Sequence, residues 1–261
     1  MPVDLHVRES GGGAPLVLLH AFPLSSAMWL EQRNDLGEVA RVVTPDLRGF
    51  GGSQLGDDEP SVDHMADDVA ALLDGLSLDT VVLGGLSMGG YVAMAFLRRH
   101  PGRVNGLLLA DTKAGPDPEE VAEKRQRIAA TLDEEQSTRV LVDEVLPGLV
   151  GETTRTQQPL VLGRVRALVE AAPPAAAAWA ERAMVARPDS LDTLTGVDVP
   201  AVVLRGDEDT MSTREDCAAM VEALPRARFV EIPGAGHLSA VESPAEFSAA
   251  VRGLLDEVAV G

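Results

Sequence analysis

The feature that most constrains the fold is an alternation of short apolar runs with longer amphipathic segments. Five runs are almost wholly apolar and are predicted to be buried strands, at residues 16–19, 41–44, 80–83, 106–110 and 201–204. Such runs are typical of a parallel sheet that helices cover on both faces. Two further segments alternate apolar and polar residues, 229–232 and 3–7. We expect them at the edges of the sheet, with 3–7 as an antiparallel strand.

Helical periodicity fills most of the segments between these strands. Residues 62–75 place apolar side chains on one face and aspartates on the other, and similar patterns cover 89–99, 213–224 and 244–258. Strands that alternate with helices predict an α/β fold, with a mostly parallel central sheet flanked by helices.

One long segment, residues 114–191, breaks the alternation. It contains no convincing strand, and its helical patterns are separated by prolines, at 119–132, 138–146, 160–171 and 175–186. At about 78 residues it is far longer than an ordinary connection between two elements. We therefore interpret it as a helical insertion into one core domain, which residues 1–113 and 192–261 form together.

Length and charge exclude several classes of protein. The chain has 261 residues, of which 45% are hydrophobic, and a formal net charge of −19. This apolar fraction is too high for a disordered chain, and no apolar run approaches the roughly 20 residues that a membrane-spanning helix needs. Nucleic-acid phosphates and anionic membranes would repel such an acidic surface, so we expect neither as a partner.

The N-terminus and the rarer residue types bear on location. One cysteine, Cys217, excludes an internal disulfide and a multi-cysteine metal site. Residues 1–6 lack the basic and apolar regions of a signal peptide, so we expect a cytoplasmic protein. Only two of the 22 basic residues are lysines, Lys113 and Lys124, which we attribute to the codon usage of a GC-rich genome.

The strongest chemical signal is the pentapeptide Gly85-Leu86-Ser87-Met88-Gly89 between a predicted strand and a predicted helix. In this setting G-x-S-x-G is typical of a tight turn that exposes a nucleophilic serine. Side chains at the two glycine positions would clash there, so Ser87 is the predicted nucleophile. The Met88 N–H at the start of the helix is predicted to stabilise an oxyanion.

A second signal is His20-Ala21-Phe22-Pro23, directly after the first buried strand. A loop at this position can supply a second backbone N–H to the oxyanion hole, and we expect that of Phe22. His20 is a candidate base, but we favour a role in holding the loop through hydrogen bonds.

The general base and its acid are expected at the ends of two later strands. Of five histidines, His237 alone lies on a short glycine-rich loop after a strand, which is where a general base could reach the serine. A base of this kind needs a carboxylate to orient it. Asp207, Glu208 and Asp209 follow one strand, and Asp111 follows another; the pattern alone leaves the choice among these four open.

Taken together, a serine, an acid and a histidine in that chain order, each at a strand end, resemble the α/β-hydrolase superfamily. Further similar motifs are 46–53 (DLRGFGGS), 99–101 (RHP) and 242–244 (ESP). The resemblance implies a triad of Ser87, Asp209 and His237, because the family's acid usually lies three residues after the glycine that ends its strand. It also implies that 114–191 is a helical cap, and that the short N-terminus leaves the sheet one strand below the usual eight.

The resemblance also implies a function. We expect a serine esterase that forms an acyl-enzyme on small or medium esters, without a metal or an organic cofactor. Alternatives are a 3-oxoadipate enol-lactonase-like lactone hydrolase, a cofactor-free perhydrolase or haloperoxidase, and a ligand receptor on the same fold. Substrate, acyl chain length and oligomeric state stay open, and a homodimer is compatible with the sequence.

The residues that would contact such a substrate are less sharply defined. Besides the triad and the oxyanion hole, we expect His20, Ala21, Asp111 and Trp179 around the pocket. Residues 155–187 contain five arginines and two glutamates, a net charge of +3 within a strongly acidic chain. This excess favours an anionic substrate, whereas a solvated helix face is the simpler explanation.

Overall fold

The computed structural model describes residues 1–260 and contains one seven-stranded sheet. The strands are β1 (Val7–Ser10), β2 (Pro15–Leu19), β3 (Arg41–Pro45), β4 (Val81–Leu86), β5 (Val104–Ala110), β6 (Ala201–Gly206) and β7 (Ala227–Ile232). Their order is β1-β3-β2-β4-β5-β6-β7, and every neighbouring pair is parallel except β1 with β3. The central strands are buried along their length, as a sheet covered on both faces requires.

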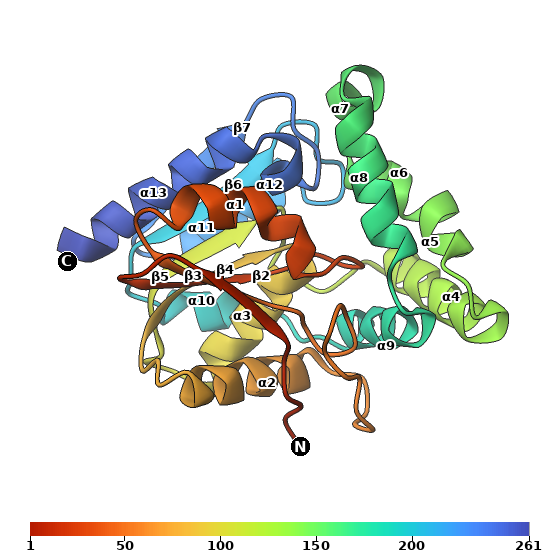
Figure 1. Ribbon diagram of the computed structural model, residues 1–261, viewed down its shortest axis with the longest axis horizontal. Helices are drawn as coiled ribbons and strands as arrows, with labels where there is room; N and C mark the ends of the chain where they lie inside the picture. Colours follow the sequence, from red (N-terminus) through yellow and green to blue (C-terminus); the bar gives the residue numbers. More distant parts are fainter. Residues whose placement is uncertain (261) are drawn as a thin grey trace.

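Helices cover both faces of this sheet (Figure 1). On one face lie α1 (Leu30–Leu36), which follows the short 3₁₀ helix η1 (Ser26–Trp29), and α13 (Pro244–Val260). The opposite face carries α2 (Val62–Gly75), α3 (Met88–Arg99) and α10 (Leu191–Thr195), with α11 (Arg214–Ala223) packed against α10. The mostly parallel α/β fold that the sequence predicts is thereby confirmed.

Residues 111–200 connect β5 to β6, and their helices α4 to α9 form a group beside the sheet (Figure 1). We call this group the inserted helices: α4 (Glu119–Glu135), α5 (Arg139–Glu144), α6 (Leu146–Leu149), α7 (Glu152–Gln157), α8 (Pro159–Glu170) and α9 (Pro174–Val185). Their two ends meet, because the Ser190 N–H donates to the Ala114 carbonyl at 3.0 Å.

Two local predictions were wrong. The antiparallel edge strand covers residues 7–10, not 3–7, because the first residues bind elsewhere: the Val3 N–H donates to Asp68 Oδ1 at 2.8 Å and the His6 N–H to Ser53 Oγ at 2.8 Å. The sequence pattern also missed α7, whose threonines have low helix propensity. A hydrogen bond to the residues after β6 holds the start of this helix instead, since Glu208 Oε2 accepts from the Thr153 N–H at 2.8 Å.

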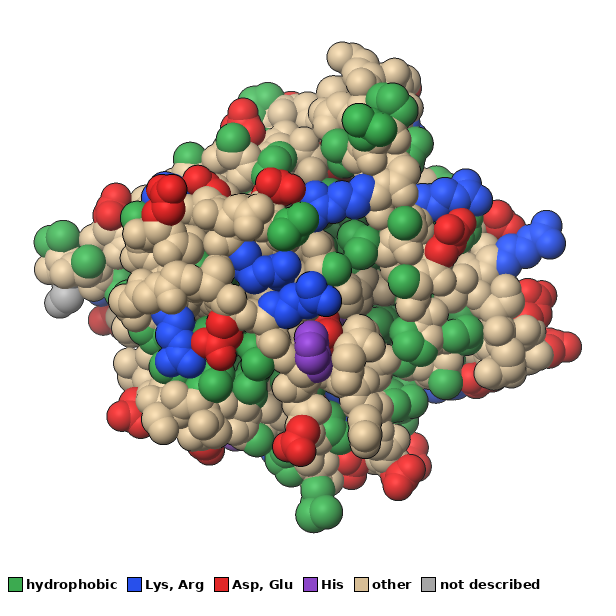
Figure 2. All heavy atoms as spheres, in the orientation of Figure 1, with side chains coloured by type: hydrophobic (Ala, Val, Ile, Leu, Met, Phe, Trp, Pro, Cys, Tyr) green, Lys and Arg blue, Asp and Glu red, His purple; other side chains and the backbone are tan. Residues whose placement is uncertain are grey.

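The surface reflects the composition. Figure 2 shows acidic side chains scattered over the visible face, with basic side chains gathered mainly near its centre. Among residues 1–260, no helix combines the length and apolar character needed to cross a membrane.

Candidate active site

The turn after β4 exposes Ser87 through a strained backbone. Ser87 has φ +56° and ψ −115°, a conformation that a residue with a side chain rarely adopts. The flanking glycines make this turn possible: a Cβ on Gly85 would lie 2.1 Å from the Gly89 carbonyl oxygen, and a Cβ on Gly89 would lie 2.1 Å from that of Leu19. Both glycines are therefore required by close backbone packing.

Three of the predicted residues form one hydrogen-bonded chain at the carboxyl edge of the sheet. His237 Nε2 lies 2.8 Å from Ser87 Oγ, and His237 Nδ1 lies 2.9 Å from Asp209 Oδ2. All three side chains are almost fully buried. This is the geometry in which a histidine can take the serine proton while a carboxylate fixes its tautomer.

The electrostatics of this chain favour an ion pair between acid and base. Burial raises the pKa of Asp209, but the neighbouring His237 and hydrogen bonds from Ser212 and the Met211 N–H outweigh it, so the net shift is downward. Burial likewise lowers the pKa of His237, and the Asp209 carboxylate reverses this to a net increase. Each group thus stabilises the charged form of the other.

The competing acids have other partners. Asp207 Oδ1 accepts from the Gly234 N–H at 2.7 Å, and Glu208 binds Thr153. Asp111, at the end of β5, accepts from the Gly206 N–H at 2.9 Å and from Ser239. Of the four candidates, the structure brings only Asp209 into hydrogen-bond contact with His237.

Asp111 is a buried carboxyl group beside this pair. Burial, and then the nearby Asp209 charge, raise the pKa of Asp111 to about 8. The raised pKa favours the uncharged form of Asp111, which reduces the repulsion between this group and the Asp209 carboxylate.

Two backbone N–H groups are available beside Ser87. Met88 is the first residue of α3, so its N–H has no acceptor within the helix. Within residues 1–260 the Phe22 N–H, in the loop after β2, also has no hydrogen-bond partner. Donors of this kind next to a nucleophile can stabilise a developing oxyanion.

A cavity of about 350 Å³ opens above Ser87 and His237, between the sheet edge and the inserted helices. Much of its wall is apolar, from Phe22, Val121, Ile128, Val145, Leu149, Met184 and Met211. This volume is enough for a small or medium-sized molecule, and the polar and charged side chains that complete the wall can orient a ligand within it.

Three of the predicted pocket residues lie outside this cavity. His20 is fully buried under the loop: its Nε2 accepts from the Leu47 N–H at 2.9 Å, and its Nδ1 binds the Ala21 carbonyl at 3.0 Å. Burial lowers the pKa of His20 to about 4, so this ring is neutral. Ala21 is also fully buried, and Trp179 Nε1 instead donates to the Asp58 carbonyl at 2.8 Å. Asp111 does line the cavity.

The arginines that suggested an anionic substrate also lie away from the cavity. Arg155, Arg164 and Arg166 pair with Glu152, Glu31 and Glu170 on the outer surface, and none of the three lines the cavity wall. These three arginines therefore belong to a solvated helix surface, as the simpler explanation held, whereas Arg187 from the same segment is buried and pairs with Asp117.

Sequence reasoning missed the cationic part of the cavity wall. Lys113, Lys124 and Arg125 line it, and Lys113 and Lys124 are the two lysines of the chain. Their rarity was the available signal, but codon usage explained it equally well, and sequence alone does not place α4 over Ser87. Among residues 1–260, no group of three or more His, Cys, Asp or Glu is arranged to hold a metal ion.

Comparison with known proteins now defines the family. A model of the alpha/beta hydrolase family matches residues 16–250, so the chain belongs to this family. A thermophilic esterase from Thermogutta terrifontis, in a malate-bound structure, is 41% identical with a TM-score of 0.93, over 98% of this chain and 94% of that one. The enol-lactonase from Burkholderia xenovorans LB400 is 29% identical with a TM-score of 0.89, over 98% and 97%.

A curated relative matches over a shorter length. The AB hydrolase superfamily protein YisY from Bacillus subtilis is 39% identical over 114 residues, which are 43% of this chain and 42% of that protein. The chain thus matches less than half of that relative, whereas the two solved structures align over nearly their whole length. The chain is accordingly a hydrolase of this family.

Proposed function

We propose that the protein hydrolyses carboxylic esters of small or medium size through an acyl-enzyme on Ser87. The observation that carries this proposal is the hydrogen-bonded chain from Ser87 through His237 to Asp209, which opens onto the cavity. The esterase from Thermogutta terrifontis, at 41% identity, supports the same reaction class.

The proposed reaction has two steps. His237 Nε2 takes the Ser87 Oγ proton while Oγ attacks the ester carbonyl carbon, and the N–H groups of Phe22 and Met88 stabilise the oxyanion. One such donor typically lowers the activation free energy by about 3 kcal/mol. The tetrahedral intermediate collapses, the alkoxide leaves with the proton from His237, and the acyl group stays on Ser87. Water, deprotonated by His237, then releases the acid.

In this proposal the inserted helices act as a cap over the catalytic serine. They supply much of the cavity wall opposite Ser87, through α4, α5, α6 and α9. A cap of this kind excludes bulk water and selects the substrate by its shape.

A lactone hydrolase is a second candidate, favoured by the enol-lactonase from Burkholderia xenovorans LB400. The same attack on a cyclic ester leaves the alcohol attached to the acyl group, so one product forms instead of two. Ester and lactone hydrolysis therefore differ in substrate shape and not in catalytic groups.

The experiment is a panel of 4-nitrophenyl esters and lactones, with fluorophosphonate labelling and a Ser87→Ala control. We expect turnover of short esters and labelling that Ser87→Ala abolishes. Peracid formation from acetate and hydrogen peroxide would identify a perhydrolase. Absence of both turnover and labelling would favour a ligand receptor.

A further inference from the structure

We propose that the cavity selects esters that carry a second, anionic group, a carboxylate, and that Lys113, Lys124 and Arg125 bind it. We call these three residues the cationic subsite. This inference rests on the proposed ester hydrolysis at Ser87 and names the substrate class of that site. It differs from the earlier expectation, which placed the positive charge on surface arginines.

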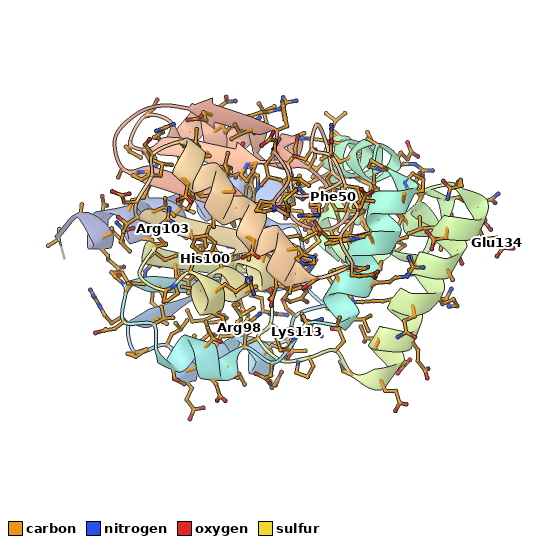
Figure 3. All side chains as sticks on the ribbon, turned by 90° about the horizontal axis from the view of Figure 1, so that it is seen from below. Phe50, Arg98, His100, Arg103, Lys113 and Glu134 are labelled. Carbon is orange, nitrogen blue, oxygen red and sulfur yellow. The ribbon has the colours of Figure 1, made fainter. Side chains whose placement is uncertain are left out.

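The cationic subsite and the nucleophile share one cavity. Lys113 comes from the segment that follows β5, two residues after Asp111, and Lys124 and Arg125 lie side by side in sequence on α4. All three line the same cavity as Ser87 and His237. In Figure 3, Lys113 lies between the core helices and the inserted helices, far from Glu134 at the outer end of α4.

Positive charge exceeds negative charge at this end of the cavity. The cavity wall carries three cations, which are the cationic subsite, and two carboxylates, Glu144 and Glu181. Asp111 also lines the cavity, and its raised pKa favours the uncharged form. Three cations against two carboxylates give this wall a net charge of +1 in a chain whose total is −19. An excess of positive charge in a low-dielectric cavity attracts anionic ligands.

Lys124 is the clearest case of a cation without an anion. Its Nζ donates only to the Glu144 backbone carbonyl, at 3.3 Å, while the Glu144 carboxylate is held by both terminal nitrogens of Arg127 at 2.7 and 2.8 Å. Within residues 1–260, no carboxylate lies within salt-bridge distance of Lys124. An ammonium group has three donors, so Lys124 retains donors for a ligand.

Lys113 and Arg125 also keep donors free. Lys113 Nζ lies 3.1 Å from Asp117 Oδ1, and Arg125 donates from Nε to Asp117 at 2.8 Å and from Nη1 to Glu181 at 2.7 Å. Arg125 Nη2 has no hydrogen-bond partner among residues 1–260. A guanidinium edge and two ammonium groups that face one cavity suit the oxygens of a carboxylate.

A purely structural role explains this cluster only in part. Asp117 ties α4 to the end of α9 through Arg125 and Arg187, at 2.8 Å each, and this accounts for both arginines. It does not account for Lys113, the third cation on Asp117, whereas Lys124 is exposed to solvent and needs no carboxylate partner for stability. Ligand binding therefore explains Lys113, and it makes use of the donors that Lys124 leaves free at the same cavity.

The test compares two esters of equal size. We would measure kcat/KM for 4-nitrophenyl monoesters of dicarboxylic acids of increasing length, and for the matching esters in which a carboxamide replaces the free carboxylate. Uncatalysed hydrolysis is subtracted from each rate. The readout is the ratio of the two kcat/KM values, carboxylate over carboxamide, for the protein, Lys113→Gln, Lys124→Gln and Lys113→Arg.

We expect a ratio above one at the best chain length, falling about tenfold in Lys113→Gln or Lys124→Gln, which is typical of a lost charge-assisted hydrogen bond. Lys113→Arg should restore most of it. The matched control is Arg166→Gln, an exposed arginine on α8 paired with Glu170, which should leave the ratio unchanged.

Different failures have different signatures. A ratio below one at every length, unchanged by either lysine substitution, would overturn the anionic subsite while leaving ester hydrolysis intact. No turnover of either ester, with no labelling of Ser87, would overturn the proposed function itself. If Lys113→Gln does not fold, Lys124→Gln decides, because Lys124 has no carboxylate partner to leave unpaired.

Discussion

Gly151 and Gly236 are in direct backbone contact, so that a Cβ on Gly236 would lie 2.1 Å from the Gly151 nitrogen. Gly236 precedes His237, and Gly151 precedes α7 of the inserted helices. Glu242 reinforces the contact, since its carboxylate accepts from the Gly151 N–H at 2.8 Å and from the Gly236 N–H at 3.0 Å. The loop that holds the histidine is therefore fixed against the inserted helices.

Gly236→Ala should move this loop and weaken catalysis. The added methyl meets backbone on Gly151, which cannot rotate away, so we expect kcat/KM to fall by at least about 100-fold as His237 is displaced from Ser87. The matched control is Gly163→Ala, in the middle of α8 with open space around its Cβ. Urea unfolding should show Gly163→Ala stabilised by up to about 1 kcal/mol; equal activity in both variants would contradict the prediction.

Removing the charge of Asp209 should cost far more activity than removing that of another nearby acid. We expect Asp209→Asn to lower kcat by about 10⁴, because the amide cannot stabilise the charged His237. Asp207→Asn and Asp111→Asn should each cost less than about tenfold, because neither side chain contacts His237. Steady-state hydrolysis of 4-nitrophenyl butyrate measures all three, and the reverse order would identify a different acid.

The pH profile should report the raised pKa of His237. The base acts in its neutral form, so kcat/KM should fall as the pH drops through the His237 pKa, which Asp209 holds above the ordinary value of about 6.5. In Asp209→Asn the residual activity should persist to lower pH, because burial alone lowers the pKa of His237. An acid limb at the same pH in both proteins would contradict this assignment.

Asp111 should make the protein less stable as the pH rises. Its pKa is about 8 in the folded state and about 3.9 in an unfolded chain, so the folded state binds more protons between these values. Asp111 therefore lowers the free energy of unfolding progressively as the pH rises from about 4 to 8. Urea unfolding at pH 5 and pH 8 measures this effect. The free energy of unfolding of Asp111→Asn, relative to that of the parent protein, should be higher at pH 8 than at pH 5. A constant difference would refute the shift.

The sequence predicted the sheet well because its strands are buried on both faces and read as continuous apolar runs. It failed at residues 3–7, where alternation suggests a strand but Asp68 and Ser53 bind the backbone instead. No periodicity in the N-terminal segment encodes contacts with residues 47 and 65 positions away.

The site residues, like the strands, were predictable where the signal is local in sequence and not where it depends on tertiary packing. Ser87 and His237 carry local signals, a glycine-flanked turn and a loop at a strand end, whereas the cavity wall depends on how helices dock. Trp179 illustrates this limit: it lies on α9, which also carries Glu181 and Met184 into the cavity, but its ring faces Asp58. Trp179 and Glu181 are two positions apart, so they point to nearly opposite sides of the helix. The sequence alone did not show which side of α9 faces the cavity.

The hydrogen bond between Ser190 and Ala114 brings the start and the end of the inserted segment together beside the sheet. The segment leaves after β5 and returns before β6, and these strands are neighbours, with Ala110 opposite Leu204. The strand pairing between β5 and β6 thus does not depend on the length of the inserted segment. The histidine loop does depend on it, through the contact of Gly151 with Gly236, so a foreign helical segment grafted at this junction would have to supply the same backbone support.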